Sequence, residues 1–467
     1  MASGVRLLRL ACCAAVFAVL SAAPVGAGAV APPTVDPGAL GPALGLAAHP
    51  APPDPTEQRS VCAEPTLIGG PPRDAPIAQR VLDLPNAWRV SRGAGQKVAV
   101  IDTGVHSHPR LPDLQPGGDF VVGSDGTVDC DGHGTLVAGI IAARPGPDDG
   151  FAGVAPDATI LTIRQLSLAY EAQNSGGTER PGSIADSGYG TVFTLAAAVV
   201  RAVDLGATVI NISETACAPA GTETVDDEVL GAAVKYAYDH DVVVVAAAGD
   251  LRQDGRCQQQ NPGSGWEAAQ LVATPAWFTP YVLSVASVDP DGTPSDLSLH
   301  GPWIGVAAIG RKIVSLDSKP GSTGLVNSMQ TRQGNADIQS TGFAAPYVAG
   351  LAALVRSRFP NLTAAQVMDR IERTAHAPGT GRDDLIGHGL IDPVAALTAV
   401  LPDQPVGAGS DRPHAIAPPA WPSGPDPRPR RIAVIGSITC LVALATGLAV
   451  AVPFRRRPYD ETDPNLD

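Results

Sequence analysis

Residues 97–104 read Lys97-Val-Ala-Val-Ile-Asp102-Thr-Gly104, a short apolar run that ends in a carboxylate and a glycine. Runs that are rich in β-branched residues and bounded by polar or Gly residues are typical of strands buried on both faces of a parallel sheet. Four later runs share this pattern, namely Thr159–Ile163, Ala207–Ile212, Val242–Ala246 and Val282–Val288. Together with Val98–Ile101 they predict five parallel strands.

Helical patterns separate these strands. One apolar stripe with helical spacing is closed by Gly206 and consists of Val192, Leu195, Ala196, Val199, Val200 and Val203. A second helix is predicted over about Val225–Asp239, and a capping box at Thr363–Gln366 begins a third. Leu166–Tyr189 is predicted to be a polar loop. The alternation predicts an α/β fold with a doubly wound parallel sheet, whose functional residues lie at the carboxyl edge of the strands.

The two ends of the chain carry export and membrane signals. Arg6 and Arg9 precede an apolar run and a small-residue site that ends at Ala29, so residues 1–29 are predicted to be a secretory signal peptide. Residues 432–452 are uncharged and apolar over about 31 Å of helix, which predicts one C-terminal transmembrane helix. Arg residues flank this run on both sides, so orientation follows from the signal peptide: the main domain is extracytoplasmic and residues 453–467 form a cytoplasmic tail.

Two Pro-rich segments flank the main domain, which is predicted over residues 97–400. Residues 30–96 form an N-terminal extension, and its part from Ala31 to about Pro76 lacks periodicity and is expected to lie along a surface. Residues 401–431 hold nine Pro and predict a semi-rigid stalk before the transmembrane helix.

Charge and cysteine content restrict the possible functions. The chain has 32 Lys and Arg against 46 Asp and Glu, a net charge of −14, which argues against nucleic-acid binding. Four cysteines, Cys62, Cys130, Cys217 and Cys257, fall on the exported side, where two disulfides in one of three pairings are expected. Nearest-in-sequence pairing would join Cys62 to Cys130 and Cys217 to Cys257. The His and acidic residues show no metal-ligand spacing, so no metal or cofactor is expected.

Three segments carry candidate chemistry. Asp102 ends the first predicted strand, and His133 opens a predicted helix in Asp131-Gly-His133-Gly-Thr135. Ser340-Thr-Gly-Phe-Ala-Ala-Pro346, before a helix predicted over Tyr347–Arg358, resembles the Gly-Thr-Ser-x-Ala-x-Pro nucleophile motif of the subtilisin-like serine proteases, whose chain order is also Asp, His, Ser. Further matches are His108-Pro109, Gly153–Pro156, Val209–Ser213, Ala248-Gly249 and Gly387–Asp392.

The features outside the motifs resemble one branch of this family, the mycosins. These features are the export signal, an extension that carries Cys62, the position of Cys130 beside His133, and the stalk before a single membrane span. Mycosins are membrane-anchored subtilases of type VII secretion systems. The resemblance implies a subtilisin-like domain at the outer face of the bacterial cell membrane, components of the secretion membrane complex as partners, and a secreted protein or peptide as a further partner. The mycosins' usual disulfide pairing agrees with nearest-in-sequence pairing here.

The sequence departs from the family at the reacting groups. The position of the Ser nucleophile, four residues before Pro346, is Gly342, which has no side-chain oxygen, while Ser340 stands at the family's Gly position. One step along a helix start turns a side chain by about 100°, so neither Ser340 nor Thr341 should point where the missing Ser pointed. Where the family places an Asn that donates to the oxyanion, this chain has Asp250.

These departures predict a pseudoprotease, in which Asp102 and His133 remain without hydrolysis. The resemblance to the mycosins implies a structural, complex-stabilising role for such a protein. One alternative is an active serine-type endopeptidase in which a backbone shift presents Ser340 or Thr341 to His133. A second alternative is a peptide-binding module that holds an extended segment by strand addition without cleavage.

Overall fold

The computed structural model describes residues 30–173, 183–184, 188–222, 225–251, 257–331 and 334–402. The predicted signal peptide, transmembrane helix and cytoplasmic tail, and the stalk beyond residue 402, lie outside the described residues. In the part of the chain that is described, no helix is both long and apolar enough to cross a membrane.

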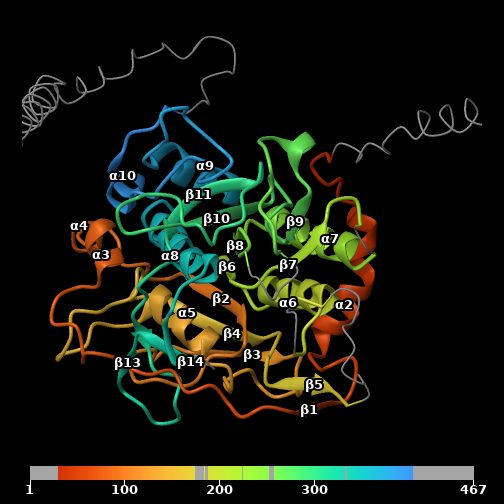
Figure 1. Cartoon of the computed structure of the whole chain (residues 1–467), viewed down its shortest axis with the longest axis horizontal. Coiled ribbons are helices and arrows are strands. Elements are labelled where there is room, and N and C mark those ends of the chain that lie inside the picture. Colours follow the sequence, from red (N-terminus) through yellow and green to blue (C-terminus); the bar gives the residue numbers. More distant parts are fainter. Residues whose placement is uncertain are drawn as a thin grey trace, which may run out of the picture. The chain divides into compact units, whose positions relative to one another are not determined.

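A parallel sheet forms the centre of the fold, with strand order β11-β10-β8-β6-β2-β4-β3 (Figure 1). Its strands are β2 (Lys97–Asp102), β3 (Gln115–Asp119), β4 (Thr159–Arg164), β6 (Val209–Ile212), β8 (Val243–Ala247), β10 (Val282–Val288) and β11 (Ile304–Ile309). Every residue of β6, β8, β10 and β11 is buried, as expected for strands covered on both faces. The five predicted strands are confirmed, with ends that differ by at most two residues.

Two strands of this sheet were missed. Edge strand β3 reads Gln-Pro-Gly-Gly-Asp, without any β-branched residue, and its pairing with β4 shifts register between Pro116 and Asp119. Pro is confined to edges and bulges of sheets, so backbone pairing rather than side-chain pattern places β3. Strand β11 is apolar throughout, and its signal was present in the sequence.

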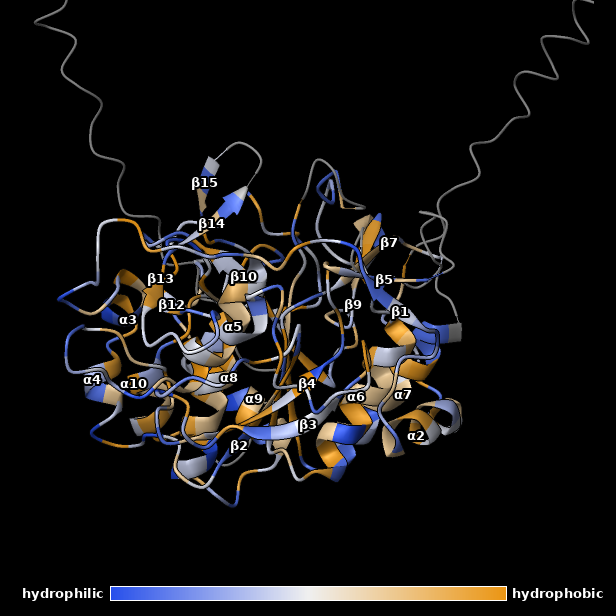
Figure 2. Ribbon diagram, turned by 90° about the horizontal axis from the view of Figure 1, so that it is seen from below, coloured by the Kyte–Doolittle hydropathy of each residue, from blue (hydrophilic) through white to orange (hydrophobic). Residues whose placement is uncertain are grey.

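Helices cover both faces of the sheet. The two central helices α5 (His133–Ala142) and α8 (Thr341–Arg358) pack together, and α6 (Val192–Asp204) packs against α7 (Val225–Asp239) on the other side (Figure 1). The capping box at Thr363–Gln366 begins α9 (Ala364–Thr374), and α10 (Pro393–Thr398) follows. These findings confirm the doubly wound α/β prediction. Figure 2 shows the apolar residues gathered in the central strands and the helices against them.

One helix begins earlier than predicted. Helix α8 begins at Thr341 rather than Tyr347 and runs through Pro346. The Ser340 hydroxyl caps it by accepting a hydrogen bond from the backbone N–H of Phe343 at 3.2 Å. Residue 342 therefore lies in the first turn of α8, whose N-terminus is at the carboxyl edge of the sheet.

The N-terminal extension is more ordered than its composition predicted. It contains η1 (Pro37–Leu40) and α2 (Gly41–Ala48), and α2 packs on α6 with Ala43 and Ala47 buried. Strand β1 (Thr56–Gln58) pairs antiparallel with β5 (Tyr170–Ala172), which lies inside the segment predicted to be a polar loop. The remaining short elements are α3 (Ile77–Val81), α4 (Leu84–Ala87), η2 (Trp266–Ala268), and the antiparallel pairs β7 (Ala216–Pro219) with β9 (Leu271–Thr274), β12 (Ser315–Leu316) with β13 (Leu325–Val326), and β14 (Ser328–Thr331) with β15 (Gly334–Asp337).

Both disulfides have nearest-in-sequence pairing. Cys62 is bonded to Cys130 with Cα atoms 4.5 Å apart, and Cys217 is bonded to Cys257 with Cα atoms 5.7 Å apart. The first joins the extension to the loop that precedes His133. This confirms the predicted pairing.

Candidate active site

Asp102 and His133 meet at the carboxyl edge of the sheet. Asp102 is the last residue of β2 and is fully buried, and His133 is the first residue of α5. His133 Nδ1 lies 2.8 Å from Asp102 Oδ1, which also accepts the Thr103 backbone N–H at 2.8 Å. A carboxylate oxygen accepts, so Nδ1 carries the hydrogen and Nε2 faces away from β2. The structure therefore brings these two residues into direct contact.

A second buried carboxylate fixes the turn before α5. Asp129 Oδ1 accepts from the Thr103 hydroxyl and from Gly132 N–H, both at 2.8 Å. Its Oδ2 accepts from the hydroxyl and the backbone N–H of Thr135, at 2.6 and 2.8 Å. Burial raises the pKa of Asp129 and outweighs these hydrogen bonds. Asp129 thus ties the end of β2 to the first turn of α5 and holds the His133 backbone in place.

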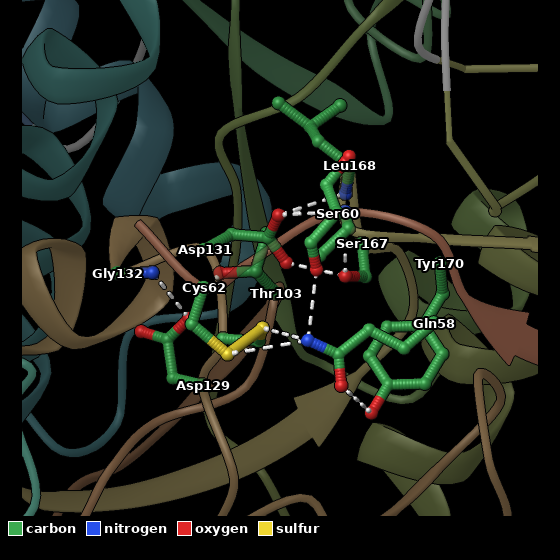
Figure 3. Close-up of a disulfide and its surroundings, with 12 residues drawn as sticks. Gln58, Ser60, Cys62, Thr103, Asp129, Asp131, Gly132, Ser167, Leu168 and Tyr170 are labelled. Atoms are coloured by element: carbon green, nitrogen blue, oxygen red, sulfur yellow. Dashed lines mark hydrogen bonds between the residues drawn. A yellow bond between two sulfur atoms is a disulfide. The ribbon is translucent and has the colours of Figure 1, made fainter. Parts of the chain in front are cut away.

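Asp131 joins the same turn to the loop after β4, as Figure 3 shows. Its carboxylate accepts from the Ser167 hydroxyl at 2.5 Å and from Leu168 N–H at 2.8 Å. Gln58 Nε2 donates to the Ser60 carbonyl at 2.8 Å and lies 3.6 Å from Cys130 Sγ (Figure 3). The extension, the Cys62–Cys130 disulfide and the His133 loop therefore form one hydrogen-bonded unit.

Gly342 lies directly opposite His133. An ideal Cβ built on Gly342 would be 3.5 Å from His133 Nε2, 3.1 Å from Ser340 Oγ and 2.7 Å from the carbonyl oxygen of Ser213. Side chains at residue 342 would therefore point at the ring nitrogen that Asp102 leaves open. The Phe343 ring packs beside the imidazole, with ring centroids 4.6 Å apart.

The two neighbouring hydroxyls are engaged elsewhere or enclosed. Ser340 Oγ caps α8 through Phe343 N–H. Thr341 is fully buried, and its Oγ1 has no hydrogen-bond partner among the described residues. The backbone N–H of Thr341 donates to Asp250 Oδ1 at 2.8 Å. This contact places Asp250, which follows β8, at the N-terminus of the 18-residue helix α8, where a carboxylate is favourable.

One more acidic side chain that faces His133 was not predicted. Glu214 follows β6, and its Oε1 lies 3.6 Å from His133 Nε2; the side chain of Glu214 is 31% exposed and that of His133 is 18% exposed. Burial by itself lowers the pKa of His133, but the carboxylates of Asp102, Glu214 and Asp129 together raise it to about 10. The available signal was positional, since Glu214 comes just after a buried strand, as Asp102 ends one.

A fold and a site of this kind define a class of hydrolases. The family model of the subtilase family matches residues 93–389, which is more than half of the chain. The chain therefore belongs to the subtilase family.

Within that family the chain is similar to the mycosins. It is 45% identical to Mycosin-4 of Mycobacterium tuberculosis over 456 residues, covering 96% of both chains. The crystal structure of MycP1 from Mycobacterium smegmatis is 43% identical with a TM-score of 0.73, covering 80% of this chain and 97% of that one. A chain in the structure of an intact ESX-5 inner membrane complex is 38% identical with a TM-score of 0.73, covering 91% of this chain and 100% of that one. The predicted resemblance to mycosin-like subtilases is confirmed.

Proposed function

We propose that this chain is a membrane-anchored, mycosin-like subtilase of a type VII secretion system that acts without hydrolysis, as a structural component of the membrane complex. The observation that carries the proposal is the position of Gly342. A side chain there would point at His133 Nε2, yet residue 342 is a glycine and has no side-chain oxygen. In a related subtilase, loss of the nucleophile lowers turnover by about 10⁶.

The surroundings of Gly342 support the absence of a substitute nucleophile. Ser340 Oγ is committed to the helix cap, and Thr341 Oγ1 is enclosed. Asp250 brings an acceptor where a subtilase needs a donor, and a carboxylate about 4 Å from a developing oxyanion opposes it by about 4 kcal/mol. Nucleophile and oxyanion donor are thus both replaced, while the Asp102–His133 pair persists.

The place of action is proposed from the relatives. The similar chain in the ESX-5 inner membrane complex supports an assembly role in a complex of the same kind. The predicted signal peptide and the span at 432–452 support a single-pass protein of the bacterial cell membrane whose main domain is extracytoplasmic.

Turnover measurements on the full chain test the loss of hydrolysis. We expect no cleavage of a mixed peptide library by the parent and no adduct with a fluorophosphonate probe. Gly342→Ser with Asp250→Asn should cleave faster than either single variant, with Asp250→Asn contributing about 10²-fold, because both changes act in one transition state.

The outcomes separate the three functions. Parent turnover that His133→Ala abolishes, or a probe adduct on Ser340 or Thr341, would establish an active endopeptidase and overturn the proposal. Saturable peptide binding by the parent without cleavage would favour the peptide-binding module over a purely structural role.

A further inference from the structure

Both ring nitrogens of His133 face carboxylates. Asp102, at the end of β2, lies 2.8 Å from Nδ1, and Glu214, after β6, lies 3.6 Å from Nε2. Asp129, in the loop before α5, is a third charged neighbour. Helix α8 presents only uncharged groups to the ring, the Phe343 side chain and Gly342. The imidazole is therefore placed between two acidic side chains that approach it from different strands.

We propose that Glu214 is a positioning residue that holds His133 as a doubly protonated imidazolium between two carboxylates, so that Nε2 cannot accept a proton. This inference extends the proposed function, because it adds a third block to hydrolysis beyond Gly342 and Asp250. It also gives the Asp102–His133 pair a structural role. Together with Glu214 the pair forms a charged cluster that joins β2, α5 and the end of β6.

Glu214 and a serine at residue 342 would compete for one atom, His133 Nε2. In a working serine protease, Nε2 must be unprotonated, because it takes the proton of the attacking hydroxyl. A carboxylate oxygen has no hydrogen to give, so Glu214 is attracted to Nε2 only when that nitrogen carries one. The ideal Cβ at Gly342 lies 3.5 Å from the same atom. Glu214 and a serine at residue 342 would thus require opposite protonation states of Nε2.

The proton equilibrium agrees with this geometry. The pKa of His133 is raised to about 10, with Glu214 among the groups that raise it. At pH 7 only about one molecule in 10³ would then carry a neutral imidazole able to act as a base.

A direct test measures the ionisation of His133 without reference to activity. The full chain in detergent micelles, labelled with ¹³C-histidine, is titrated by NMR, and His133 is assigned by its loss in His133→Ala. Glu214→Gln should lower the pKa of His133 by about one unit or more, because it removes one of two adjacent negative charges. Glu214→Asp keeps the negative charge but places it farther from His133, so it should lower the pKa of His133 by less. This variant replaces Glu214→Gln in the test if Glu214→Gln does not fold. Glu267→Gln, at an exposed position in η2, is the matched control and should cause no change.

A second measurement asks whether Glu214 restrains a repaired site. In the background Gly342→Ser with Asp250→Asn, adding Glu214→Gln should raise peptide turnover at pH 7 by about 10-fold or more and move the acid limb of the pH profile to lower pH. An unchanged pKa of His133 in Glu214→Gln and Glu214→Asp overturns the inference, whatever the turnover. A lowered pKa with no turnover in any repaired variant supports the role of Glu214 and counts against the repair on which the proposed function relies.

Discussion

Glu372 is a partly buried acid outside the active site. It lies on α9 beside β11, where an ideal Cβ on Gly305 would be 3.0 Å from its Oε1. Burial raises the pKa of Glu372 from 4.5 to about 7; Asp369 adds to the rise and Arg382 opposes it. The carboxyl group is therefore most favourable in the fold when it is protonated.

This shift predicts how stability depends on pH. The folded state binds the proton of Glu372 more tightly than the unfolded chain does. The contribution of this proton to the free energy of unfolding is therefore fully present below about pH 4.5 and is lost as pH rises through about 7. Glu372→Gln should stabilise the protein by about 2 kcal/mol at pH 8 and by little at pH 4. Thermal melts at both pH values measure this, with Glu267→Gln as control; equal effects at the two pH values would contradict it.

At the candidate active site, the sequence predicts the residues that belong to motifs but not the one that a loop brings in. Asp102, His133, Asp250 and residue 342 could be predicted to converge, because each has a fixed place in a motif at a strand end or helix start. Glu214 was missed although it follows a buried strand, because its contact with His133 depends on how the chain turns after β6, and no motif specifies that turn.

At the scale of elements, the β1–β5 pair and the Cys62–Cys130 disulfide attach the extension to the site. Near the disulfide, Gln58 Nε2 lies 3.6 Å from Cys130 Sγ, and the Asp131 carboxylate accepts a hydrogen bond from Leu168 N–H (Figure 3). The disulfide closes a loop with a sequence separation of 68 residues. Because a cross-link of that span restricts the unfolded chain, it is expected to contribute several kcal/mol.

Removing this cross-link should loosen the His133 turn as well as the extension. Cys62→Ser with Cys130→Ser is expected to destabilise the protein by about 2–5 kcal/mol and to speed hydrogen exchange of the amides of residues 56–62 and 130–135. Denaturant unfolding and exchange mass spectrometry measure the two effects. The matched pair Cys217→Ser with Cys257→Ser should leave exchange at 130–135 unchanged; protection there that is equal in both double variants would refute the attachment.

Some helices and strands could be predicted from local sequence patterns and others could not. Helix α6 was predicted with its stripe and its closing Gly206 because local pattern and tertiary packing agree there. Helix α8 was placed six residues late because Pro346 usually ends or precedes a helix, whereas here the packed helix continues through it. Strands β1 and β5 have three residues each, too few for a period to be read, and they form only because the extension and the loop lie side by side.

The whole chain is predicted to have a single-pass membrane topology. If residues 1–29 direct export and residues 432–452 stop transfer, a reporter fused after Asp467 should be cytoplasmic and one inserted at Ser410 should be extracytoplasmic. Alkaline phosphatase and green fluorescent protein fusions distinguish the two sides. Release of the full-length chain as a soluble protein, or the opposite pattern of reporters, would show that the chain is not anchored in this way.

The carbonyl of Ser213 leaves little room for any side chain at residue 342. It lies 2.7 Å from where a Cβ at residue 342 would be, so it occupies room that a serine side chain needs. A serine introduced there would bring a hydroxyl toward His133 Nε2, but its Cβ would meet this backbone atom, so the turn after β6 must shift to admit it. Because Glu214 follows Ser213 directly in the chain, the same shift is expected to move the carboxylate that faces His133 Nε2.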